Sequence, residues 1–178
     1  MFKKLFRTIL LIVTLLALTA VASAAEPSKK LFDESNVAII TAAPKDFTQQ
    51  ELDSITPYIR AKMRFPDYSI QSNEIVPYGS ITEHTELAKI AKEKNADILL
   101  FMNIPVYEEY MVVSMFGNEL WYVNVNADIY LYDTKTKSLQ IKKVRYRDSG
   151  NYGSIRHPNE VMIKALTDAL DKLPTTIK

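Results

Sequence analysis

The clearest pattern in the chain is a strict alternation of apolar and polar residues over residues 121–132. Odd positions carry Trp, Val, Ala, Ile and Leu, whereas even positions carry Tyr, Asn and Asp. Because successive side chains of a strand point to opposite faces, this segment predicts a strand with one buried and one hydrated face. Such a strand is typical of an antiparallel sheet that helices cover on one side.

Other segments predict further strands and helices. Strands are expected at 37–40, 68–76, 96–113 and 139–147, and helices at 47–65, 80–95 and from about 157 to 173. In the first helix Thr48 and Glu51 fit a capping box, and Pro57 either kinks the helix or starts a second segment. The order is strand, helix, strand, helix, three strands and a helix. We therefore expect a single α+β domain over residues 36–174, with a mixed four- to five-stranded sheet and helices mainly on one face.

The N-terminal segment has the features of a secretory signal peptide over residues 1–24. A basic start with Lys3, Lys4 and Arg7 precedes an apolar run at 9–21 and the small-residue cleavage pattern at 22–24. An uncleaved anchor is the alternative, but this run is shorter than the roughly 20 residues that span a bilayer. Residues 25–35 are polar and predict a flexible lead. No second long apolar run follows, so we expect no stable membrane span after cleavage.

Charge and cysteine content narrow the class of protein. Removal of 24 residues from the 178 leaves 154 residues, with 19 bases and 21 acids because the leader contains three bases and no acid. A charge this close to neutral argues against a nucleic-acid partner. The chain has no cysteine, so it has no disulfide and no lipid-carrying cysteine at the cleavage site. These features predict a periplasmic or secreted protein.

Three stretches carry a resemblance to a known group of bacterial envelope domains. They are NVAII, then LAKIAKEKNADILLFMNI, and a strand that ends in Asp133 and Thr134 before a polar turn. Over residues 36–173 the chain resembles the group of the curli-secretion channel protein, the penicillin-binding-protein activator lipoprotein and the N-terminal domain of the Tol–Pal propeller protein. The resemblance implies a non-enzymatic interaction module of the cell envelope with no catalytic residues. Members are often lipoproteins, and because this chain lacks the cysteine, their anchoring does not carry over.

Catalytic, metal and cofactor motifs are absent from the sequence. The two histidines, His84 and His157, do not have metal-binding spacing, and no phosphate-binding or nucleophile motif occurs. Glu108 and Glu109 are adjacent and would point to opposite faces of a strand. Asp133 has the position of a turn residue that bonds its own backbone. We expect no cofactor, and the alternative function is a small envelope hydrolase with a site assembled from distant residues.

Cations and aromatic residues are predicted to share the hydrated face of the sheet. Lys143, Arg145 and Arg147 lie on one side of the last strand, and the preceding strand supplies polar and aromatic partners: Tyr122, Asn124, Asn126, Asp128, Tyr130 and Tyr132. This face could bind an acidic protein segment or an anionic envelope polymer. The alternative is an ordinary hydrated face with cross-strand pairs, such as Asp128 with an arginine.

The turn between the two longest predicted strands is unusually apolar. Met111, Val112, Val113, Met115 and Phe116 surround the turn residues. Exposed apolar patches mark contacts, so we expect Met115 and Phe116 to contact another chain. A homodimer through this hairpin or through an edge strand, contact with a membrane, and burial by folding back are the alternatives.

Overall fold

The structure is a computed structural model that describes residues 34–64, 66–81, 84–171 and 173. The predicted signal peptide and nearly all of the predicted lead lie outside these residues, and Ser35 already begins the first strand. The elements follow the predicted order. They are β1 (Ser35–Ala43), α2 (Gln49–Lys62), β2 (Tyr68–Pro77), α3 (His84–Glu93), β3 (Ile98–Val113), β4 (Glu119–Asp133), β5 (Ser138–Gly150), a 3-10 turn (Tyr152–Ser154) and α4 (Pro158–Leu170).

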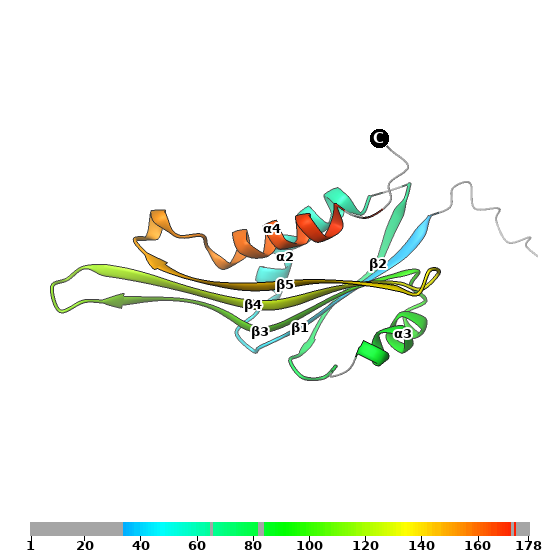
Figure 1. The fold of residues 1–178 in the computed structure, drawn as a ribbon, viewed down its shortest axis with the longest axis horizontal. Coiled ribbons are helices and arrows are strands. Elements are labelled where there is room, and N and C mark those ends of the chain that lie inside the picture. Colours follow the sequence, from blue (N-terminus) through cyan, green and yellow to red (C-terminus); the bar gives the residue numbers. More distant parts are fainter. Residues whose placement is uncertain (1–33, 65, 82–83, 172, 174–178) are drawn as a thin grey trace, which may run out of the picture. The chain divides into compact units, whose positions relative to one another are not determined.

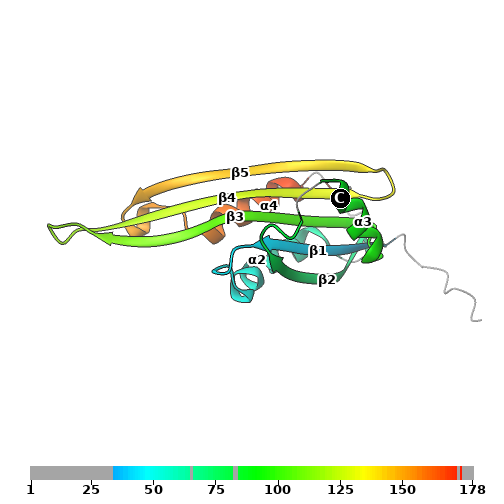
Figure 2. The same ribbon diagram turned by 90° about the horizontal axis from the view of Figure 1, so that it is seen from below.

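All the strands belong to one mixed sheet, in the order β2-β1-β3-β4-β5 (Figures 1 and 2). β1 is parallel to both β2 and β3, whereas β3, β4 and β5 form an antiparallel meander. The expected α+β class and mixed sheet are confirmed, with five strands in the described part of the chain.

Helices cover the two faces of the sheet unequally, as expected. α2 and α4 pack on one face of the sheet, over the main apolar core. α3 packs on the other face, over a smaller core (Figure 1). Crossovers between parallel strands are right-handed, and the step from β1 to β2 runs opposite to the step from β2 to β3 across the sheet. The two crossover helices, α2 and α3, therefore lie on opposite faces.

The predicted capping box at the start of α2 is confirmed. The Thr48 backbone N–H donates to Glu51 Oε2 at 2.8 Å, and the Thr48 side chain also pairs with this carboxylate. α2 continues as one helix through Pro57. Pro57 has no N–H to donate to the Asp53 carbonyl, and both residues are exposed.

β3, β4 and β5 extend beyond β1 and β2 as an arm, which becomes two-stranded only past Trp121 of β4 and Gly150 of β5. Pairing of β1 with β3 ends at Ala42 and Asn103, and the β3–β4 register shifts between Asn103 and Val106. From Val106 to the end of β3, pairing continues with β4 alone. In both views the tip of the arm projects past the helices (Figures 1 and 2).

Candidate interaction surfaces

The strand register brings the three predicted cations onto one face with the polar residues of β4. Lys143 pairs with Asp128, Arg145 with Asn126, and Arg147 with Asn124. Directly paired residues of antiparallel strands share a face of the sheet. We call this set of residues, together with Tyr122, the cationic face; it is the face opposite to α4.

Charge on the cationic face is partly neutralised. Arg145 Nη2 lies 2.8 Å from Asp128 Oδ1, and Arg145 Nη1 donates to the Ala127 carbonyl at 2.9 Å. Lys143 and Arg147 are exposed and form no ion pair with any residue that the structure describes. These two side chains are therefore available to an anionic group from outside.

One of the predicted aromatic residues, Tyr130, is buried, so the expectation that it lies in the hydrated face was wrong. Tyr130 is only 8% exposed and stacks on Phe101, with ring centroids 5.6 Å apart. Tyr132 is partly buried against the same small core beneath α3. The reason is the reversal of the second crossover, which places α3 over this end of the face. Burial, followed by the Asp128 charge, raises the pKa of the Tyr130 hydroxyl above its ordinary value.

Tyr122 lies where the cationic face meets the arm. Its ring stacks on Tyr110 of β3, with centroids 5.3 Å apart and planes 14° apart. Glu108 lies on the same face and accepts a hydrogen bond from Asn124 Nδ2 at 3.2 Å. The register of β3 and β4 therefore continues one polar and aromatic surface from the cationic face to the arm.

The turn of the arm holds its apolar side chains in solvent. Met115 is 98% exposed and Phe116 is 90% exposed. Gly117 adopts a φ of +75°, and Ser114 Oγ accepts from the N–H groups of Phe116 and Asn118. We call residues 111–120 the hairpin tip; all of them are exposed. Among the described residues none covers Met115 or Phe116, so no described segment buries them by folding back.

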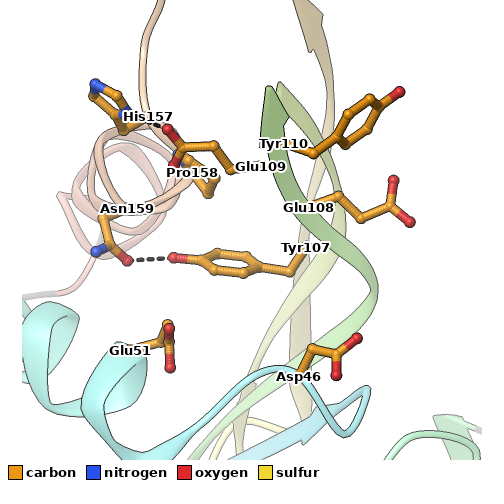
Figure 3. A pocket seen from close by; sticks show the side chains of 9 residues that line it. All are labelled: Asp46, Glu51, Tyr107, Glu108, Glu109, Tyr110, His157, Pro158 and Asn159. Carbon is orange, nitrogen blue, oxygen red and sulfur yellow. Dashed lines mark hydrogen bonds and ion pairs between the residues drawn. The ribbon is translucent and has the colours of Figure 1, made fainter. Parts of the chain in front are cut away.

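A hollow of 730 Å³ lies along β3 at the base of the arm (Figure 3). Its lining comes from β3, from the start of α2 with the loop before it, and from the start of α4: Tyr107, Glu108, Glu109, Tyr110, Asp46, Glu51, His157, Pro158 and Asn159. Tyr107 and Glu109 point to the opposite side of β3 from Glu108 and Tyr110 (Figure 3).

Several contacts tie β3 to α4 in this hollow. His157 Nδ1 lies 2.6 Å from Glu109 Oε1, and the Tyr107 hydroxyl donates to Asn159 Oδ1. Burial, then the carboxylates of Glu51 and Glu109, raises the pKa of Tyr107 above its ordinary value of 10.0. Sequence reasoning missed the pairing of Glu109 with His157, because 48 residues separate them and neither lies in a motif.

The structure assigns Asp133 to a turn. Its Oδ1 accepts from the backbone N–H groups of Lys135 at 2.8 Å and Thr136 at 3.1 Å, as the sequence predicts. None of the described residues that line the hollow is a serine, threonine or cysteine. In the described ranges, no three His, Asp or Glu side chains are grouped to hold a metal ion. Nor does this part of the chain contain a helix long and apolar enough to cross a membrane.

Comparison with known proteins finds similarity in arrangement only. No protein-family model matches the sequence, and no curated protein matches it. A PelC dodecamer from Paraburkholderia phytofirmans is 14% identical with a TM-score of 0.44, over 75% of this chain and 87% of that one. Lipoprotein GNA1162 from Neisseria meningitidis is 10% identical with a TM-score of 0.39, over 78% of this chain and 99% of that one.

Proposed function

We propose that this protein is a non-enzymatic interaction module of the bacterial cell envelope, located in the periplasm or secreted. It binds another protein or an anionic polymer through the cationic face and the hairpin tip. The exposure of Met115 and Phe116 at the end of an ordered arm is the observation that carries this proposal.

The hairpin tip supplies apolar contact area. A Met or Phe side chain that moves from water into an apolar pocket contributes roughly 1.5–3 kcal/mol. This burial energy does not stabilise the fold itself, because both side chains are almost fully exposed. A partner with a matching apolar pocket would gain it, which is the usual physical basis of a binding hot spot.

The cationic face supplies positive charge. Lys143 and Arg147 are exposed without ion pairs among the described residues, so an acidic group would meet charge that the chain has not already neutralised. The stacked pair of Tyr110 and Tyr122 lies between these cations and the hairpin tip. One partner could therefore contact the cations, the aromatic pair and the tip together.

Crosslinking and capture from native envelope extract, with mass spectrometry, tests the proposal. Three baits are compared with wild type: Lys143→Glu with Arg147→Glu, Met115→Asp with Phe116→Asp, and a control. The control, Arg60→Glu with Lys164→Glu, makes the same charge change at exposed positions of α2 and α4. Arg145 is left unchanged, so its pair with Asp128 remains.

We expect a partner that wild type and the control capture and that both surface variants lose. Purified partner, or an anionic polymer, should then bind wild type with an affinity that falls as salt rises. Capture that is equal for all four baits would refute the assignment of these two surfaces. Turnover of a substrate by the purified protein would refute the non-enzymatic class.

A further inference from the structure

The β3 side of the arm has an unpaired strand edge. β1 ends at Ala43, and its last partner on β3 is Asn103. Residues 106–113 pair with β4 on one side, and no described residue forms a backbone hydrogen bond with them on the other. In an antiparallel strand the N–H and C=O groups of alternate residues point to each side. Alternate residues of this segment therefore present a free donor and acceptor to the open side.

This edge carries two charged side chains, Glu108 and Glu109, but no proline or lysine that would discourage strand pairing. Exposed edges are commonly blocked by proline, by lysine or by a covering segment. Pro105 stands just before the free segment, and residues 106–113 contain no proline, lysine or arginine. The edge is thus able to accept another strand, which is a known mode of peptide recognition.

The hollow at the base of the arm runs along this edge. Four consecutive residues of β3, 107–110, line it, although neighbouring side chains point to opposite faces. A cavity that meets both faces of a strand must lie beside the strand's edge. Its far walls come from the start of α2 and the start of α4 (Figure 3). An added strand would lie about 4.8 Å from β3 and pair over about 13 Å with these four residues.

Charge in the hollow selects the kind of strand. Asp46, Glu51, Glu108 and Glu109 line it, and the lining contains no lysine or arginine. Among the described lining residues, His157 is the one basic side chain, and it already contacts Glu109. A segment with lysine or arginine would place its cations among these carboxylates, whereas an acidic segment would be repelled.

We propose that the free edge of β3 binds an extended, basic segment of a partner protein as an added strand. Backbone hydrogen bonds to alternate residues of 106–113 hold the segment, and the four carboxylates select lysine or arginine in it. This site differs from the two surfaces of the proposed function because it uses the backbone edge of β3 and the start of the helices. It shares Tyr110 and residues 111–113 with the surface that runs to the hairpin tip. It calls for a partner segment of the charge opposite to the one that the cationic face would bind.

Fluorescence anisotropy with dye-labelled octapeptides tests this proposal on the full chain, purified after expression with its own N-terminal segment. The probe alternates lysine and valine, and a second peptide replaces every lysine with glutamate. Two further lysine peptides carry N-methyl groups on odd or on even residues. Methylation removes amide donors and blocks pairing only where they face β3, so the protein itself is unchanged in this comparison.

We expect saturable binding of the lysine peptide, no binding of the glutamate peptide, and a clear difference between the two methylated peptides. Asp46→Asn with Glu108→Gln should weaken binding between roughly twofold and thirtyfold, the range that two surface charge pairs give. Asp53→Asn with Glu93→Gln, which removes two exposed acids of α2 and α3, should leave it unchanged. Equal affinity of the two methylated peptides would overturn strand addition, and would reduce the effect to charge attraction.

Two controls distinguish peptide binding at this edge from binding at the cationic face and from self-association. Lys143→Glu with Arg147→Glu should bind the lysine peptide as well as wild type, because the cationic face does not contribute to binding at the edge of β3. Sedimentation velocity measures self-association of the same samples. A chain that dimerises through the arm and binds no peptide would overturn the proposal in favour of a second copy at this edge.

Discussion

Tyr107 joins three elements at the base of the arm, and its hydroxyl is a sensitive test of that joint. Its ring meets Phe47 edge-on, with centroids 5.0 Å apart, and its hydroxyl donates to Asn159 at the start of α4. The change Tyr107→Phe keeps the ring and removes the hydroxyl alone. Asn159 then loses a hydrogen bond in a partly buried position.

At neutral pH this change should destabilise the protein. The net contribution of one hydrogen bond is about 1 kcal/mol, and the Asn159 oxygen that is left without its donor adds to the loss. We therefore expect the free energy of unfolding of Tyr107→Phe at pH 7 to be lower than that of wild type by about 1 kcal/mol. Asn159→Ala should cost a similar amount, and the double variant should cost less than the sum.

At alkaline pH the difference should shrink and then change sign. The pKa of Tyr107 is raised in the folded state above the ordinary 10.0 of an unfolded chain. A raised pKa contributes stability in full below pH 10, and that stability is lost as pH rises above 10, because the unfolded state releases the proton first. At pH 11 the loss reaches about 1.4 kcal/mol at most, and less where water reaches the ring. Phenylalanine cannot ionise, so the variant avoids this loss.

Urea unfolding of both proteins at pH 7, 9, 10 and 11, followed by circular dichroism, measures the effect. The other tyrosines with a raised pKa, which are Tyr68, Tyr130 and Tyr146, are common to both proteins and cancel in the difference. The curves should converge between pH 10 and 11. A constant difference over the whole range would refute the assignment of the raised pKa to a buried, hydrogen-bonded Tyr107.

Three further changes test the division between core and surface. Met115→Asp with Phe116→Asp should alter the free energy of unfolding by no more than about 0.5 kcal/mol, because both side chains are exposed; urea unfolding checks this. Met102→Ala in the same strand as the arm should cost roughly 2–5 kcal/mol in the same assay, because Met102 is fully buried. Asp133→Ala should lower the free energy of unfolding by about 1 kcal/mol, since it removes the oxygen that accepts from the Lys135 and Thr136 amides. Hydrogen exchange of these two amides should become faster.

Periodicity predicted the strands and their buried sides well, because both follow from neighbouring residues in the sequence. Val123, Val125, Ala127, Ile129 and Leu131 all lie in the main core, as the alternation indicates. The shared face of Lys143, Arg145 and Arg147 was also predictable, because residues two apart in a strand point the same way.

Properties that depend on how distant segments cross could not be predicted in this way. Tyr130 has the same alternation as Asn126, yet α3 covers only Tyr130, since the strand order decides where that helix crosses. The contact of Glu109 with His157 depends on where α4 begins relative to β3. The free edge of β3 exists because pairing with β1 ends at Asn103, ten residues before β3 ends at Val113, and no local pattern within β3 indicates this.

Contacts with the segment between β5 and α4 hold the arm in place, which affects how strongly it can bind a partner. Trp121 of β4 meets Tyr152 edge-on at 4.8 Å, and Tyr152 packs on His157 at 4.4 Å. The segment between β5 and α4 therefore supports the arm from the side opposite to the cationic face. A strand edge and a tip that are already ordered lose little conformational entropy when a partner binds, so more of the contact energy contributes to affinity. If the Trp121→Ala variant kept full affinity for both a tip partner and a β3 peptide, this anchoring would have no part in binding.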